Sequence, residues 1–136
     1  WGYGTVGSVV ARDLVQSGFY VGIAGRNAKK IEELRNTLGM KQSESHILDF
    51  SDENILITSM QDYDVILNCV EYTLNQMILK ACIKAKKHYI DLWDYYEGIL
   101  QSRSHDAELK NAGIVGLLWA GSSPGIINVM ITHIAR

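Results

Sequence analysis

Two patterns of apolar and polar positions alternate along this chain of 136 residues. Short, almost continuous apolar runs rich in β-branched residues are typical of strands that a parallel sheet buries on both faces. Between these runs, apolar residues recur every three or four positions, as in amphipathic helices. Strands are predicted at 19–24, 45–49, 64–70, 87–92 and 114–120, and helices at 8–17, 28–38, 74–85 and 95–111, with two more helices opening near 51–53 and 123–124. This alternation predicts an α/β fold with a doubly wound parallel sheet, three layers and right-handed crossovers.

Residues that favour helix ends mark the boundaries of these predicted elements. Gly18 and Gly39 each follow a helical stretch, and glycine readily adopts the left-handed backbone that closes a helix. Asn27 stands where it can cap the next helix. Ser123 followed by Pro124 has the order of an N-cap and a first helical residue, so a helix is expected to begin there.

The chain opens on a glycine pattern, Gly2-x-Gly4-x-x-Gly7, directly before a predicted helix. In a dinucleotide-binding fold the first glycine allows a tight turn, the second lets the backbone approach a pyrophosphate, and the third lets the helix pack closely. The helix N-terminus then offers free amide donors and a favourable dipole to the anion. The predicted cofactor contacts from this loop are Gly2, Tyr3, Gly4, Thr5, Val6 and Gly7.

A glycine-rich turn before an ordinary helix would give the same pattern, so the context of the loop has to decide between the two interpretations. Loop, helix and apolar strand follow in the order that a Rossmann-type fold requires. Such a fold also places a strand before the loop, and only Trp1 stands there. We therefore expect that this chain begins inside the fold, with the first strand absent.

The end of the predicted strand 19–24 carries information about the cofactor. NAD-selective folds usually place an acid there for the adenine ribose hydroxyls, whereas an arginine suits the 2′-phosphate of NADP. Here the strand runs into Gly25, Arg26 and Asn27, without an acid. A hydrogen bond to a charged group contributes about 1.5–3 kcal/mol, or roughly one to two decades of preference for NADP. These three residues are predicted to contact NADP, with NAD as the alternative cofactor, and a solvated Arg26 is the competing interpretation.

Polar residues follow two further strands at the edge where open α/β sheets bind ligands, outside the carboxyl ends of the strands. Asp49 ends the strand 45–49, near the expected adenine edge, although a turn-forming or capping role fits it equally well. Asn68, Cys69 and Val70 end the next strand and are predicted to contact the cofactor near its nicotinamide.

The segment that follows holds the predicted substrate contacts, Glu71, Tyr72 and Thr73. A carboxylate beside a nicotinamide can act as a general base when its pKa is raised towards neutrality. Glu71 as such a base is one hypothesis, and a solvated or locally hydrogen-bonded Glu71 is the other. No convincing acid–base pair stands out in the sequence, so no catalytic residue is assigned.

Composition and charge argue against several other classes of function. A net charge of −2 gives no electrostatic reason to expect nucleic acid or an anionic membrane as a partner. No apolar run approaches the length of a membrane span and no signal peptide is visible, so a cytoplasmic protein is expected. Cys69 and Cys82 lack a Cys-x-x-Cys spacing and the four histidines lie far apart, so we expect reduced cysteines and no metal site.

Five features in this order resemble the saccharopine dehydrogenase-like family of NADP-dependent oxidoreductases, over essentially the whole chain. They are the loop 2–7, the strand ending in Ala24-Gly25-Arg26-Asn27, the buried strand followed by Tyr72-Thr73, the segment 81–91, and Ser123-Pro124-Gly125-Ile126-Ile127-Asn128. The resemblance implies an NADP-binding Rossmann domain over residues 1–121. It also implies that residues 122–136 begin a helix leading into a catalytic domain that this chain lacks.

The resemblance also implies a reaction, hydride transfer between NADP and a C–N bond of a small, amino-acid-like substrate. The chain alone is then expected to be inactive, and a homodimer formed through the absent domain is left open. Saccharopine reductases carry an acid before the Pro-Gly pair and an Asp-His pair after the following Ile, where this chain has Ser123, Ile127 and Asn128. This difference argues against saccharopine or glutamate as the substrate.

Other classes of function remain as alternatives. A non-catalytic, dinucleotide-binding regulatory module would use the same loop without hydride transfer, because a fold does not fix a function. A methyltransferase also has a glycine-rich loop, but that fold normally needs an acid where this chain has Arg26. A short-chain dehydrogenase is disfavoured because no Tyr in the chain is followed four residues later by Lys.

Overall fold

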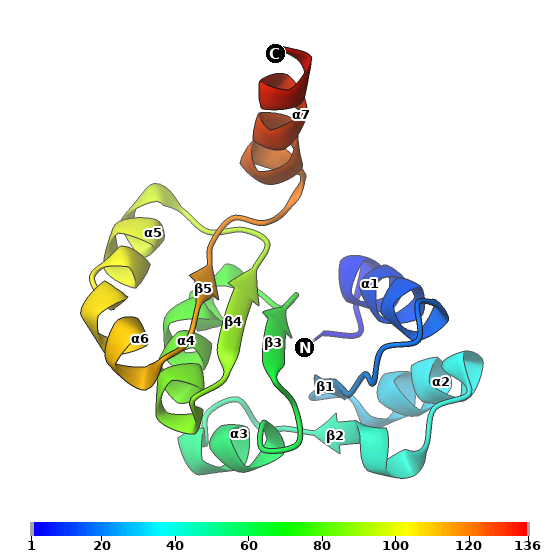
Figure 1. Cartoon of the computed structure of the whole chain (residues 1–136). Helices are drawn as coiled ribbons and strands as arrows, with labels where there is room; N and C mark the ends of the chain where they lie inside the picture. Colours follow the sequence, from blue (N-terminus) through cyan, green and yellow to red (C-terminus); the bar gives the residue numbers. More distant parts are fainter. Residues whose placement is uncertain (1, 136) are drawn as a thin grey trace.

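The computed structural model describes residues 2–135 of the chain (Figure 1). Within that part, five short parallel strands form two sheets. In one, β1 (Ile23–Gly25) pairs with β2 (Ser45–Ile47). In the other, β4 (His88–Asp91) lies between β3 (Val65–Asn68) and β5 (Gly116–Leu117). These pairings confirm the predicted α/β fold with parallel strands.

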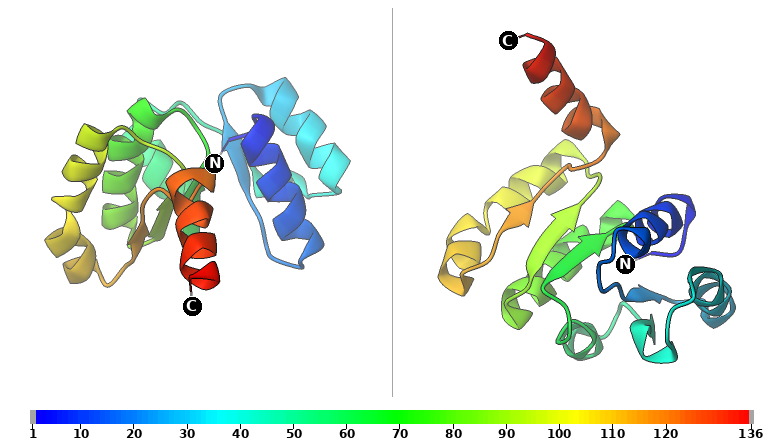
Figure 2. Two further views of the ribbon diagram at one scale, coloured as in Figure 1. Left: turned by 90° about the horizontal axis from the view of Figure 1, so that it is seen from above. Right: turned by 45° about the vertical axis from the view of Figure 1, so that its right-hand side comes forward.

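Helices lie on both sides of the strands (Figure 2). Helix α2 packs on β1 and β2 with α1 beside it, whereas α4 packs on β3 and β4 and is flanked by α3, α5 and α6. The helices are α1 (Thr5–Gln16), α2 (Ala28–Leu38), α3 (Glu53–Ser59), α4 (Asn75–Ala85), α5 (Tyr96–Arg103), α6 (Asp106–Ala112) and α7 (Ile127–Ile134). None of the helices within residues 2–135 is long and apolar enough to cross a bilayer.

Several helix ends follow the capping residues that the sequence places there. Asn27 caps α2 by accepting a hydrogen bond from the Lys30 amide over 3.1 Å, and Gly39 closes the helix with a φ of 67°. Asp52 caps α3 in the same way, accepting from the Asn54 amide over 2.9 Å. These boundaries confirm the helix ends predicted from the sequence.

The main hydrophobic core lies between α4 and the β3–β4 pair. Tyr89 of β4 is fully buried, as are Ile78, Leu79 and Cys82 of α4, and Leu56 joins them from α3. The spacing of the α4 residues places them on the helix face that packs on the sheet. A smaller core joins α1, β1 and α2.

The prediction of a strand starting at residue 19 is wrong for its first four residues, 19–22. Phe19 and Tyr20 are 64% and 62% exposed, and strand pairing begins only at Ile23, where β2 supplies a partner. The length of β1 is therefore set by the three residues of β2 rather than by the local apolar run.

The strand predicted at 114–120 is also shorter in the structure. Only Gly116 and Leu117 pair with a neighbour, Tyr89 and Ile90 of β4. Residues on either side of this two-residue strand still bond to β4: the Val115 carbonyl accepts from the Tyr89 amide and the Ala120 amide donates to the Asp91 carbonyl, each over 2.9 Å.

The helix predicted at 95–111 is in fact two helices, α5 and α6. Ser104 ends α5: its amide donates to the carbonyls of Leu100 and Gln101, and its hydroxyl donates to the Gln101 carbonyl over 2.6 Å. Serine competes with the helix for backbone groups in this way. His105 then precedes α6, and its Nδ1 lies 2.8 Å from an oxygen of the Glu108 carboxylate.

The segment after β5 leads into a helix, as Ser123 and Pro124 predict. Ser123 has an extended backbone, with φ −135° and ψ 122°, and the turn Ser122–Ile126 continues into α7. Helix α7 points away from the rest of the structure (Figure 1). Its apolar side chains are exposed, from 43% at Ile127 to 79% at Ile134.

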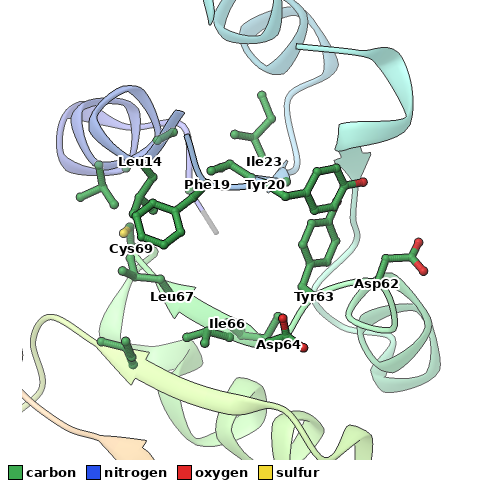
Figure 3. Close-up of a pocket in the computed structure, with 18 residues that line it drawn as sticks. Leu14, Phe19, Tyr20, Ile23, Asp62, Tyr63, Asp64, Ile66, Leu67 and Cys69 are labelled. Atoms are coloured by element: carbon green, nitrogen blue, oxygen red, sulfur yellow. The ribbon is translucent and has the colours of Figure 1, made fainter. Parts of the chain in front are cut away.

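A cavity of about 410 Å³ lies between β1 and β3 and separates the two sheets (Figure 3). Its lining is mostly apolar, with Leu14 and Phe19 on one side and Leu67 on the other. At one end the rings of Tyr20 and Tyr63 stack, with centroids 5.6 Å apart. The cavity therefore runs along the facing edges of β1 and β3, and its lining includes three of the predicted cofactor residues, Gly2, Gly7 and Cys69.

We predict that Leu79→Ala, in the main core, lowers the free energy of unfolding by about 2–5 kcal/mol, because it leaves a cavity beneath the sheet. Leu100→Ala is the matched control: Leu100 lies on α5 and is 48% exposed, so its loss should change the value by less than about 0.5 kcal/mol. Urea denaturation followed by circular dichroism measures both. Equal losses in the two variants would contradict this description of the core.

Candidate dinucleotide-binding site

The glycine loop is held against the ends of β1 and β3. Gly2 has a backbone φ of 121°, a conformation that residues with a Cβ rarely adopt. Its amide donates a hydrogen bond to the Ala24 carbonyl of β1 over 3.0 Å. A Cβ added at Gly2 would lie 2.9 Å from the carbonyl oxygen of Cys69, just after β3. The first glycine therefore lets the loop pass between the two sheets.

The other two glycines shape the start of α1. A Cβ at Gly7 would overlap the carbonyl of Gly2, so Gly7 is what lets the helix approach the loop. Gly4, the N-cap, has open space on the side where a Cβ would stand, with no atom of residues 2–135 within 4 Å. No side chain caps α1 and its first turn carries no acid, so the amides of that turn are available to an anion.

Basic and aromatic side chains gather where β1 ends. The ring of Tyr3 lies against Gly25, leaving no room for a Cβ there. The Lys30 ammonium group stands 6.0 Å from the centroid of that ring, within the range of a cation–π interaction. Arg26 is exposed directly after the strand. Lys30 is not among the residues predicted from the sequence, and the structure places it beside them.

We call Arg26 and Lys30 the basic group. Asp49 follows β2 and lies beside it. Its carboxylate accepts hydrogen bonds from the amide and hydroxyl of Ser51, over 3.0 and 2.8 Å. These bonds lower the pKa of Asp49, and the nearby charge of Arg26 lowers it further. The turn-forming role considered for Asp49 is therefore present, at a position next to Arg26.

The side chain of Asn68 points into a buried polar network at the end of β3. Its amide donates to the Asn75 side-chain oxygen over 2.7 Å, and its own oxygen accepts from the Val70 amide over 3.1 Å. Asn75 in turn donates to the Trp93 carbonyl and to the Asp94 carboxylate, over 2.8 and 3.0 Å. This network fixes the backbone of residues 68–70 relative to α4 and to the loop after β4.

The thiol of Cys69 is half-buried beside the glycine loop and lines the cavity between the sheets (Figure 3). Burial raises its pKa, so at neutral pH the group is a thiol and not a nucleophilic thiolate. The structure thus brings Cys69 next to Gly2, as expected for the end of a strand beside the phosphate loop.

The predicted substrate residues lie on the turn before α4. Glu71 and Thr73 are exposed, and Tyr72 begins the short helical turn Tyr72–Leu74. The ring of Tyr72 contacts Trp93 and Tyr95 from the loop after β4, with centroids 4.6 and 4.5 Å away. We call Tyr72, Trp93 and Tyr95 the aromatic cluster.

Asp91, at the end of β4, holds the chain that follows β5. Its carboxylate accepts a hydrogen bond from the Trp119 amide over 2.7 Å, and it is 1% exposed. Trp119 has a left-handed backbone, with φ 58°, and its ring N–H donates to the Asp94 carbonyl over 3.1 Å. Burial raises the pKa of Asp91, and the Trp119 hydrogen bond opposes this effect.

A glycine loop against two parallel strands, an open helix N-terminus and a basic group at the next strand end together define a dinucleotide-binding domain of the Rossmann type. The chain belongs to the family described as the saccharopine dehydrogenase NADP binding domain, whose model matches residues 1–117. NADP is accordingly the cofactor, with NAD as an alternative, and the family is one of oxidoreductases.

Individual relatives agree with this assignment. The carboxynorspermidine synthase of Vibrio alginolyticus is 27% identical, over 99% of this chain and 38% of its own. The carboxyaminopropylagmatine dehydrogenase of Synechocystis is 26% identical, over 97% of this chain and 36% of its own. The chain thus spans little more than a third of the length of these curated relatives.

A solved structure shares the fold. The apo saccharopine dehydrogenase (L-Glu forming) from Saccharomyces cerevisiae superposes with a TM-score of 0.82, covering 98% of this chain and 29% of that one. The two sequences are 22% identical. This neighbour confirms the predicted Rossmann-type architecture.

We predict that two glycine variants separate cofactor binding from loop folding. Gly4→Ala should cost less than about 1 kcal/mol of stability, because its backbone suits alanine and no atom is near. It should nevertheless weaken NADPH binding by obstructing the approach of the pyrophosphate. Gly7→Ala should lower both stability and binding, because its Cβ collides with the loop itself. NADPH titration and thermal unfolding of both variants provide the measurement, and normal binding by Gly4→Ala would contradict the placement of the pyrophosphate.

We predict that Asp91→Asn changes how stability depends on pH. A carboxyl whose pKa is raised on folding binds its proton more tightly in the folded state, so its contribution to stability falls as pH rises from about 4 through the folded pKa. The asparagine can still accept from Trp119 but does not titrate. The difference in unfolding free energy, variant minus parent, should therefore rise between about pH 4 and pH 7. A difference that is constant across that range would contradict the raised pKa.

Proposed function

We propose that the full-length protein is an NADP-dependent oxidoreductase that transfers hydride between the nicotinamide and a C–N bond of an amino-acid-like substrate. The observation that carries the proposal is that the candidate site residues lie along one edge of the structure, at the carboxyl ends of the strands. The open N-terminus of α1, the basic group after β1 and the loops after β3 and β4 follow one another along the carboxyl ends of the strands. A dinucleotide lying there would reach from the basic group to the aromatic cluster.

The residues present fit NADP. The space beside Gly4 would admit the pyrophosphate to the free amides of α1, where the helix dipole favours an anion. Arg26 and Lys30 would hold the 2′-phosphate, Arg26 through its planar fork of donors. The ring of Tyr3 would lie beside the adenosine, because it covers Gly25 at the end of β1.

At the other end, bound NADP supplies the hydride acceptor or donor. The backbone of residues 68–70 would border the nicotinamide, and the buried Asn68–Asn75 pair keeps that backbone in place. Glu71 stands exposed at the same edge, and its role as a general base stays a hypothesis. The names of the curated relatives, a carboxynorspermidine synthase and a carboxyaminopropylagmatine dehydrogenase, support a carboxylated amine as the kind of substrate.

We also infer the division of the chain into a Rossmann domain, residues 1–121, and the beginning of a second domain, residues 122–136. The exposed apolar side chains of α7 support this division, because apolar surface of this extent normally packs against another part of a protein.

We predict that NADPH binds the full-length protein at least tenfold more tightly than NADH, because only NADPH carries the phosphate that Arg26 would meet. Arg26→Ala should weaken NADPH binding by roughly one to two decades and leave NADH binding nearly unchanged. Arg103→Ala, an exposed arginine at the end of α5, is the matched control and should bind like the parent. Nicotinamide fluorescence or calorimetry gives the affinities.

The other outcomes of this titration would indicate a different function or remove Arg26 from the site. If neither nicotinamide cofactor binds, the oxidoreductase proposal is wrong, and binding of S-adenosylmethionine instead would indicate a methyltransferase. If NADPH binds but a panel of amines and keto acids gives no turnover, the non-catalytic regulatory module is the better description. An equal loss in Arg26→Ala and Arg103→Ala would remove Arg26 from the site.

A further inference from the structure

Three loops meet at the carboxyl edge of the β3–β5 sheet, and their composition is unusual for this chain. Residues 69–75, 92–98 and 118–126 together hold five aromatic side chains and three carboxylates but no Lys, Arg or His. The chain as a whole is nearly balanced, with 13 basic and 15 acidic residues. This edge is therefore selectively acidic and aromatic.

Two of the three rings of the aromatic cluster are exposed at this edge. Trp93 and Tyr95 are 50% and 54% exposed, with ring centroids 5.2 Å apart. The ring of Tyr72 stands nearly perpendicular to Trp93, at 89°, and to Tyr95, at 79°. Such an arrangement presents ring faces and edges at one place while the rings stabilise one another.

Buried hydrogen bonds hold these rings in position. The Trp93 carbonyl accepts from the side chain of Asn75, and the Asp94 carboxylate accepts from Asn75 and from the Tyr95 amide, the latter over 2.7 Å. The Asp94 carbonyl accepts from the indole of Trp119. Because the backbone on both sides of the rings is fixed, a ligand would find the cluster already formed and would lose little affinity to ordering it.

Three carboxylates lie within two residues of the rings in the sequence. Glu71 precedes Tyr72, Asp94 lies between Trp93 and Tyr95, and Glu97 follows two residues later. A hydrogen bond with Tyr95 is the main effect that raises the pKa of Tyr72, and the charges of Glu71 and Asp94 raise it further. Both carboxylates therefore act at the cluster.

We propose that the aromatic cluster binds the ammonium group of an alkylamine or diamine substrate, a proposal that rests on the proposed function and specifies the charge of its substrate. Ring faces attract a cation through their quadrupole, and the surrounding carboxylates add a favourable potential. A substrate whose carboxylate had to lie here would meet only acids. The ammonium end of the substrate would thus lie against the loop that follows β4.

The test is a calorimetric titration of the full-length protein with 1,4-diaminobutane, both without cofactor and with saturating NADPH. Two four-carbon probes serve as comparisons, the neutral 1,4-butanediol and the anion butyrate. Trp93→Leu removes the largest ring, Trp93→Phe restores a smaller one, and Phe19→Leu is a control at another exposed aromatic residue, on the border of the cavity.

The diamine should bind more tightly than either comparison probe, and added salt should weaken it. Trp93→Leu should reduce its affinity about fivefold to thirtyfold, and Trp93→Phe should recover part of the loss. Phe19→Leu should bind the diamine like the parent.

Three outcomes would overturn the proposal: equal binding of diamine and diol, no diamine binding with or without NADPH, or an equal loss in Trp93→Leu and Phe19→Leu. NADPH binding is measured in the same samples. Its failure would refute the proposed function, while the titration without cofactor would still decide whether the cluster binds a cation.

Discussion

The approach of backbone to backbone at Gly2 and Gly7 is the constraint on which the cofactor site depends. Gly2 brings the loop within reach of both sheets, and Gly7 brings α1 down onto the loop. Each contact would be blocked by a single Cβ, so the position of the free helix N-terminus is set by the lack of two side chains. The open space beside Gly4 can admit a pyrophosphate only because Gly2 and Gly7 place Gly4 at the carboxyl edge of the strands.

Charge is distributed unevenly along that edge. Arg26 and Lys30 stand where β1 ends, while the loops after β3, β4 and β5 contribute carboxylates and rings without a basic residue. A dinucleotide phosphate is anionic and an amine is cationic, so the two halves of the edge favour different ligands. The same distribution disfavours a reversed cofactor, whose phosphate would then lie among Glu71, Asp94 and Glu97.

Local chemistry made the sequence informative about helix ends and the phosphate loop. Asn27 and Gly39 act within one turn of α2, so their effect can be read without knowing the fold. The strand at 19–24 was predicted too long because pairing depends on a partner that lies elsewhere in the chain. The break at Ser104 was missed because the competing hydrogen bond of a serine hydroxyl leaves no mark on apolar periodicity.

The same difference between local effects and contacts of distant residues applies to the candidate site. The loop, Arg26, and residues 68–73 could be placed at one edge because parallel strands end together. Asn75, Asp94 and Trp93 could not, because they become neighbours only when α4 packs beside the loop after β4. Polar residues that serve a buried network look, in the sequence, like ordinary residues of a helix start or a turn.

The cavity between the sheets has a consequence for how the two sheets could be joined. β1 and β3 are each the outermost strand of their sheet on the side of the cavity, and the walls between them are mostly apolar. Edge strands are templates for further strand pairing, and an apolar slot favours a β-branched segment over a polar one. One further extended, apolar segment lying in this slot would therefore pair with β1 and β3 at once and join the two sheets.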